Sequence, residues 1–175
     1  MQENFAALQF EEFETFKKNH SEYVPMFMEF DLVGMVVRLH DKFTVLKTVV
    51  NDKASSSVKP VVVELLSDIM NYSVLASIVP DTADFDKRFT AKQEEFFKSL
   101  DTVTEQQLAP AVLMTQVFDA YRTFMKVFTI ANNGIMYVGS ELDKTILQLT
   151  LKNMHVYAGL LVLEIRKSVS TQSDS

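Results

Sequence analysis

The chain contains no cysteine and few of the residues that interrupt helices. The absence of cysteine excludes disulfides, thiolate zinc ligands and a cysteine nucleophile. Glycine and proline occur only four times each in 175 residues, which leaves long segments without a turn-forming residue. Apolar residues make up 47% of the chain and include 14 phenylalanines and 9 methionines, enough for a substantial core. Together these features favour an all-α protein over a fold of strands and turns.

Signals for export, membrane insertion and nucleic-acid binding are also lacking. The N-terminus, Met1-Gln2-Glu3-Asn4, has no basic segment of the kind that begins a signal peptide. The longest purely apolar runs span a few residues, whereas a membrane-spanning helix needs about 20. The net charge of −6 provides no basic stripe that could follow a phosphate backbone. We therefore expect a cytoplasmic protein that binds neither membranes nor nucleic acids.

Proline, glycine and polar connections divide the chain into six segments with the spacing of amphipathic helices. Val61-Val62-Val63 alone would suit a strand, but the apolar spacing that follows it is helical. The polar segment 169–175 has no periodic face, so we predict that it is disordered. The predicted helices span about residues 4–20, 26–50, 60–79, 83–100, 105–131 and 140–167.

The second half of the chain resembles the first. Each half has a shorter helix followed by two long ones, and short motifs recur in matching places. Any two amphipathic helices look somewhat alike, so coincidence is the alternative to a duplication. We predict a six-helix bundle of two three-helix halves, residues 1–80 and 81–168, related by a pseudo-two-fold axis. The matching segments are 13–17 with 94–98, 38–43 with 116–121, and 68–73 with 153–158.

Two motifs about 30 residues apart carry a resemblance to a known family. They are Arg38-Leu39-His40-Asp41-Lys42 in the second predicted helix and Asp68-Ile69-Met70-Asn71-Tyr72 in the third. They resemble nucleotide modification associated domain 1, a phage and bacterial family related to the MazG-like all-alpha nucleotide pyrophosphohydrolases. The resemblance covers residues 18–76, about a third of the chain, and begins at Lys18-Asn19-His20-Ser21-Glu22-Tyr23.

The resemblance implies magnesium-assisted cleavage between the α and β phosphates of a nucleotide. It implies Asp41, Glu64 and Asp68 as the catalytic and metal-binding residues, because Mg²⁺ prefers oxygen ligands. Glu64 and Asp68 lie four positions apart on one helical face, and Asp41 would approach from the facing helix.

The same resemblance implies four nucleotide-binding residues. Arg38 and Lys42 would neutralise phosphate oxygens, and Asn71 and Tyr72 would contact the base or the sugar. The ligand would be a nucleotide or another small phosphorylated molecule.

The chain departs from the family's pattern at several positions. Val45 stands where the middle helix has a second arginine, and Pro60 lies near the place of an expected acid. In the second half, Ala120 corresponds to Lys42 and Asn153 to Asp68, so we predict that this half binds no metal. We predict a nucleotide-binding protein derived from a Mg²⁺-dependent (d)NTP pyrophosphohydrolase, with catalysis reduced or lost.

Ordinary structural roles are the alternative explanation for these residues. Arg38, Asp41 and Lys42 would also suit a solvated charge network on a helix, and Tyr72 would suit a core position with its hydroxyl at the surface. No glycine-rich phosphate loop or nucleophile elbow is present. The alternative function is a non-catalytic interaction protein, for example a phage-encoded one in the host cytoplasm, that binds a protein or a signalling nucleotide.

Overall fold

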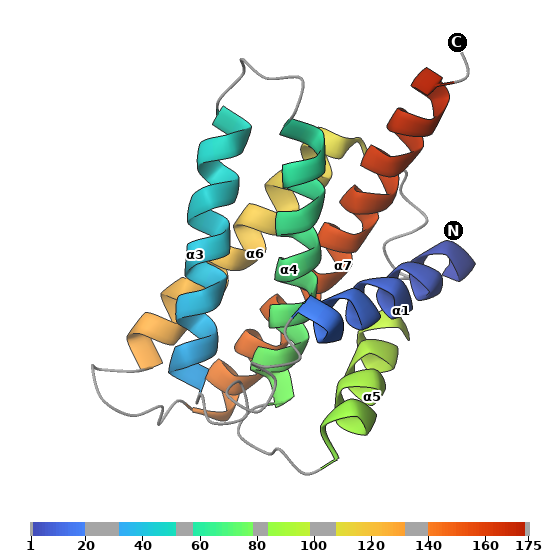
Figure 1. Cartoon of the computed structure of the whole chain (residues 1–175). Coiled ribbons are helices and arrows are strands. Elements are labelled where there is room, and N and C mark those ends of the chain that lie inside the picture. Colours follow the sequence, from blue (N-terminus) through green and yellow to red (C-terminus); the bar gives the residue numbers. More distant parts are fainter. Residues whose placement is uncertain are drawn as a thin grey trace.

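Figure 1 shows the computed structural model of the chain, which describes residues 2–19, 32–51, 58–78, 84–98, 108–131 and 140–173. These residues form six α helices and no strand, so the predicted all-α fold is confirmed. The segment from His20 to Tyr23, part of the family-like entry motif, lies outside the described residues. The helices are α1 (Gln2–Asn19), α3 (Leu32–Asn51), α4 (Val58–Ile78), α5 (Phe85–Phe97), α6 (Pro110–Ala131) and α7 (Glu141–Ser173).

Local sequence explains where the C-terminal helices begin. Pro110 is the first residue of α6, a position that needs no backbone N–H donor. Ser140 precedes α7, and its backbone N–H donates to Asp143 Oδ2 at 2.9 Å. The Asp143 N–H donates in return to Ser140 Oγ at 3.2 Å, which completes a capping box. At its other end α7 continues to Ser173, so residues 169–173 of the segment predicted to be disordered are helical.

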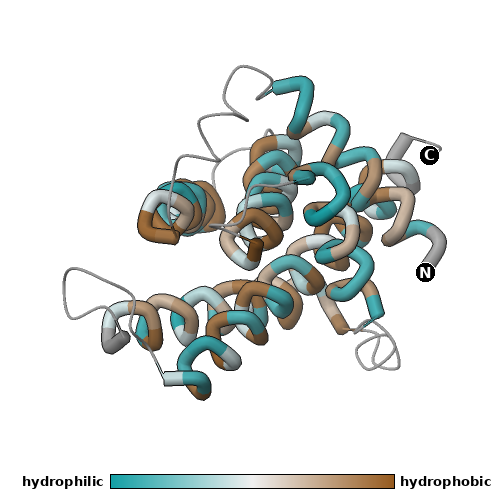
Figure 2. The backbone as a smooth tube through the Cα atoms, turned by 90° about the horizontal axis from the view of Figure 1, so that it is seen from below, coloured by the Kyte–Doolittle hydropathy of each residue, from teal (hydrophilic) through white to brown (hydrophobic). Residues whose placement is uncertain are grey.

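The helices form three layers, which are seen edge-on in Figure 1. α4 and α7 lie side by side in the middle, α3 packs against α4, and α6 packs against α7. α1 and α5 cover the opposite side of the central pair. Along the helices apolar stretches alternate with polar ones, as Figure 2 shows, and the apolar stretches supply the buried core.

Contacts between α3 and α6 are reciprocal between the two halves. Phe43 stacks on Tyr121 with ring centroids 3.9 Å apart, and these two residues occupy matching positions in the predicted repeat. Phe43 also contacts Phe118 at 5.6 Å, while His40, which matches Phe118, bonds to the Tyr121 hydroxyl at 2.5 Å. Across a two-fold axis each contact between unlike positions occurs twice. These contacts therefore support the predicted pseudo-two-fold relation, which stays a prediction for the halves as a whole.

Contacts between α1 and α5 are reciprocal as well. Gln9 Nε2 donates to the Gln93 carbonyl at 3.2 Å, and Gln93 Nε2 donates to the Gln9 carbonyl at 3.3 Å. The ring of Phe13 stacks on that of Phe89 with centroids 4.0 Å apart, and the ring centroids of Phe5 and Phe97 are 6.2 Å apart. The reciprocal contacts make each α1 residue equivalent to the α5 residue 84 positions later, as for Gln9 and Gln93. The sequence motifs 13–17 and 94–98 instead pair residues 81 positions apart. The structural correspondence is therefore shifted by about one helical turn.

Two helices have the length and composition of a membrane span, Lys59–Ile78 of α4 and Glu141–Ser170 of α7. Neither is an uninterrupted apolar run, since Glu64 and Asp68 lie within the first and Lys152 within the second. In the folded chain 72% and 61% of an apolar 18-residue stretch of each helix is buried. A core helix of a folded domain and a membrane span share this length and composition, so the two properties alone do not distinguish them.

Candidate functional site

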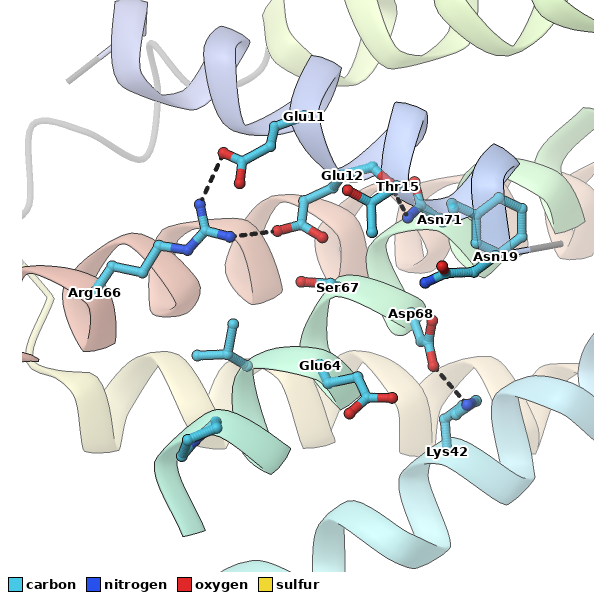
Figure 3. Close-up of a pocket in the computed structure, with 13 residues that line it drawn as sticks. Glu11, Glu12, Thr15, Asn19, Lys42, Glu64, Ser67, Asp68, Asn71 and Arg166 are labelled. Atoms are coloured by element: carbon cyan, nitrogen blue, oxygen red, sulfur yellow. Dashed lines mark hydrogen bonds and ion pairs between the residues drawn. The ribbon is translucent and has the colours of Figure 1, made fainter. Parts of the chain in front are cut away.

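A pocket of about 400 Å³ lies between α1 and α4 (Figure 3). Lys42 of α3 borders it on one side and Arg166 of α7 on another, so both halves of the chain contribute to it. Its volume is within the range of small-molecule sites. The side chains that line it are Glu11, Glu12, Thr15, Phe16, Asn19, Lys42, Pro60, Val63, Glu64, Ser67, Asp68, Asn71 and Arg166.

Four of the seven residues predicted from the sequence line this pocket. Glu64, Asp68 and Asn71 lie along one face of α4, and Lys42 reaches them from α3. Lys42 Nζ lies 2.5 Å from Asp68 Oδ2, and the two side chains are 30% and 17% exposed. This partly buried ion pair joins the two family-like motifs.

Asp41 lies away from the pocket. It is exposed on α3. Burial raises the pKa of the Tyr121 hydroxyl, and the nearby charge of Asp41 raises it further. Burial is the larger of the two causes. Asp41 therefore faces α6, while its neighbour Lys42 faces α4. The described residues contain no group of three His, Cys, Asp or Glu side chains that could hold a metal ion.

Arg38 and Tyr72 are not among the residues that line the pocket. Tyr72 is 3% exposed and makes an edge contact with Phe16 at a centroid distance of 5.6 Å. Burial raises the pKa of the Tyr72 hydroxyl to about 12, and the nearby Asp68 charge adds to the effect while Arg38 opposes it. Tyr72 is thus a core residue that packs behind the pocket wall.

The acidic side chains opposite Glu64 and Asp68 come from α1, a helix that carries none of the site residues predicted from the sequence. Arg166 of α7 binds both of them, with Nη1 3.1 Å from Glu11 Oε2 and Nη2 2.7 Å from Glu12 Oε1. Glu12 is far less exposed than Glu11, at 9% against 61% of the side chain. The Glu12 bond is therefore the better shielded from solvent.

Glu12 is a titratable group with a shifted pKa. Burial raises the pKa of its carboxyl, while the nearby Ser67 hydroxyl and the Arg166 charge lower it. The negative charges of Glu11 and Asp68 add to the rise. The pocket thus holds a carboxyl whose charged form is disfavoured by its surroundings.

Two buried polar atoms in the α4 wall have no hydrogen-bond partner among the described residues. They are Ser67 Oγ and Asn71 Oδ1, on side chains whose residues are 7% and 2% exposed. Ser67 lies close enough to Glu12 to affect its pKa, but its hydroxyl does not reach hydrogen-bonding geometry. Asn71 Nδ2 donates to the Glu12 backbone carbonyl at 3.3 Å, which leaves the amide oxygen free.

The pocket is acidic as a whole. Four carboxylates line it, on Glu11, Glu12, Glu64 and Asp68, against the two cations Lys42 and Arg166. Both cations are engaged by carboxylates. Glu64 makes no ion pair with any described residue and is exposed at the rim.

Comparison of the chain with protein-family models, curated proteins and solved structures gave no match. The resemblance to MazG-like pyrophosphohydrolases therefore stays a prediction from the residues quoted above.

Proposed function

We propose that this pocket binds a nucleotide together with Mg²⁺. The observation that supports the proposal is the convergence of Lys42, Glu64, Asp68 and Asn71 on one pocket. The first three are residue types that contact phosphates and the metal ions bound to them. Lys42, Asp68 and Asn71 belong to the two motifs that resemble nucleotide pyrophosphohydrolases, and Glu64 lies within the wider stretch, residues 18–76, that the resemblance covers.

The charge of the pocket explains why a metal ion is part of the proposal. Bare phosphates would meet more carboxylates than cations here. Mg²⁺ is commonly held by one or two carboxylates together with substrate phosphates and water. Glu64 and Asp68 offer such carboxylates, so the residues present fit a metal ion that arrives with the nucleotide. When bound, the ion would neutralise phosphate charge and polarise the phosphoryl oxygens.

The roles of the protein residues follow from their positions. Lys42 can turn from Asp68 to a phosphate oxygen, since its side chain is partly exposed. Glu64 has its carboxylate available at the rim. Glu11, Glu12 and Arg166 hold α1 and α7 at the other end of the pocket, where the remainder of the ligand would lie. The proposal concerns binding alone, because Asp41, one of the three predicted catalytic acids, does not line the pocket.

Thermal unfolding tests the proposal directly. ATP, CTP, GTP and UTP at millimolar concentration, each with and without Mg²⁺, are the probes. A nucleotide at about 100 times its Kd stabilises the folded state by about 2.7 kcal/mol, which raises Tm by about 5–10 °C for a chain of this size. We expect this rise only when Mg²⁺ is present.

Matched variants localise the effect. Glu64→Gln and Asp68→Asn should weaken the Mg²⁺-dependent stabilisation, while Asp119→Asn on the exposed surface of α6 should leave it unchanged. A complete lack of stabilisation by every nucleotide would sink the proposal. The alternative prediction, a helical interaction protein, would then be tested by capturing partners from a lysate.

A further inference from the structure

We infer that the inner end of the pocket, formed by Glu12, Ser67 and Asn71, is a subsite for an amino group of the ligand. Its use by a nucleotide base rests on the proposed function, but the chemistry of the subsite does not. Glu12 lies on α1, and Ser67 and Asn71 lie on the facing side of α4 (Figure 3).

Unpartnered buried polar atoms are the first reason. More than nine in ten buried polar groups in folded proteins have a hydrogen-bond partner. Here Ser67 Oγ and Asn71 Oδ1 both lack one among the described residues, and both belong to the wall of the same pocket. They lie one helical turn apart on α4, in the same stretch of the pocket wall.

The direction of the missing hydrogen bonds is the second reason. The orientation of the Asn71 amide is fixed because its Nδ2 donates to the Glu12 backbone carbonyl. The unpartnered atom is therefore the amide oxygen Oδ1, which can only accept. The ionised Glu12 carboxylate also only accepts, and the Ser67 hydroxyl can accept or donate. A ligand group at this place must therefore donate more than one hydrogen bond. An amino group does so, whereas a carbonyl oxygen would face the lone pairs of Asn71.

The charge of the surroundings is the third reason. Glu11 and Glu12 give this end two carboxylates against the single guanidinium of Arg166. Burial raises the pKa of Glu12, so a donor that hydrogen-bonds to its charged form relieves an unfavourable state. Neutral and cationic amino groups both meet this requirement. The amino group can come from a nucleotide base or from an aliphatic amine.

Ligand pairs that differ in the amino group test the inference. ATP and ITP differ by an amino group against an oxo group, and so do CTP and UTP. Putrescine and 1,4-butanediol make the same comparison for an aliphatic amine. Titration calorimetry, with Mg²⁺ for the nucleotides, measures each Kd. We expect the amino member of at least one pair to bind about tenfold more tightly or better, because its partner leaves buried acceptors unpaired.

Two variants and a control connect this preference to the residues. Ser67→Ala and Asn71→Leu should reduce the preference to within about twofold. Asp68→Asn should weaken all nucleotides alike and keep the preference, because Asp68 lies at the Lys42 end. Circular dichroism verifies folding, and Ser67→Ala carries the test if Asn71→Leu does not fold.

The outcomes separate this inference from the proposed function. Equal affinities within all three pairs, or a preference that survives both variants, would overturn the amino subsite. In the first case, Mg²⁺-dependent binding of nucleotides would still stand. If no nucleotide binds but putrescine does, and Ser67→Ala weakens it, the subsite is supported and the proposed function fails. If no ligand binds, both are overturned.

Discussion

A fully buried histidine makes the stability of this protein depend on pH. His155 of α7 is 0% exposed and lies among the rings of Phe5 and Phe96. Its Nδ1 lies 3.0 Å from the Met70 carbonyl, which only accepts, so Nδ1 carries the proton. Nε2 then accepts from Gln9 Nε2 at 2.6 Å. Both ring nitrogens are thus satisfied in the neutral form, and a second proton would point at a donor.

The magnitude follows from the shift in pKa. Burial lowers the pKa of His155 from 6.5 to about 4, although the Met70 carbonyl opposes the change. The unfolded chain therefore takes up a proton as pH falls through 6.5, while the folded chain does not do so until about pH 4. The stabilisation is fully present above pH 6.5 and is lost progressively as pH falls to about 4. At about 1.4 kcal/mol per pKa unit, the loss is about 3 kcal/mol.

The perturbation that isolates this contribution is His155→Gln, which keeps a donor and an acceptor but does not titrate. Urea unfolding of both proteins between pH 7 and pH 4 gives the free energy of unfolding at each pH. Burial also raises the pKa of Glu12, so other groups add to the pH dependence and the difference between the two proteins is the informative quantity. We expect this difference to change by about 3 kcal/mol from pH 7 to pH 4 in favour of the variant.

A second variant separates titration from lost packing. Thr150→Val alters another buried residue of α7, one that has no titratable group. The resulting change in the free energy of unfolding should therefore be the same at every pH. Parallel curves for the natural protein and His155→Gln would refute the reasoning, whatever the cost of the substitution at pH 7.

Three further predictions concern contacts that hold the helices together. Gly159→Ala should lower stability by about 1–3 kcal/mol in urea unfolding, because its Cβ would lie 2.5 Å from Phe5 Cε2 and 2.9 Å from Met70 Cε in a filled core. Arg166→Ala should cost about 1–3 kcal/mol near pH 7 and less in acid, since it leaves the buried Glu12 carboxylate without its cation. The control Lys167→Ala, which removes an exposed pair with Glu164, should cost less than about 0.5 kcal/mol. Phe43→Ala should cost about 3–5 kcal/mol and shift thermal unfolding downward, because it removes the stacking contact with Tyr121 between α3 and α6; an unchanged Tm would contradict this role.

Helical periodicity predicts the pocket residues that share one helix. Glu64, Asp68 and Asn71 are three or four positions apart, and α4 places them on one face as expected. Lys42 and Asp41 show the limit of this reasoning. They are neighbours, so they point about 100° apart around α3, and only packing decides which of them faces α4. The structure directs Lys42 to Asp68 and leaves Asp41 beside Tyr121.

The other end of the pocket could not be predicted from local sequence. Glu12 and Arg166 are 154 residues apart, and their contact depends on how α1 crosses α7. Glu11 and Glu12 look like ordinary exposed acids of an amphipathic helix, and nothing in their spacing marks one of them as buried. Ser67 is a common residue in a helix, and its missing hydrogen bond becomes visible only when its neighbours are known.

The two halves of the predicted repeat differ at the positions that line the pocket. With the repeat in register, Leu149, Asn153 and Val156 of α7 take the places of Glu64, Asp68 and Asn71 of α4. By the reciprocal contacts between α1 and α5, Phe96 of α5 corresponds to Glu12 of α1. Phe96 packs on His155 at a centroid distance of 5.5 Å. Each half of such a bundle must bury an apolar face against the other half. A single ligand site needs polar side chains in one half only. The second half has apolar residues at three of these four positions. Two of them, Val156 and Phe96, are buried in the core, while Leu149 is 48% exposed. Val156→Asn introduces the residue type of Asn71, its counterpart in the predicted repeat. It should destabilise the protein by leaving a buried amide without partners, and it should leave ligand binding at the α1–α4 pocket unchanged.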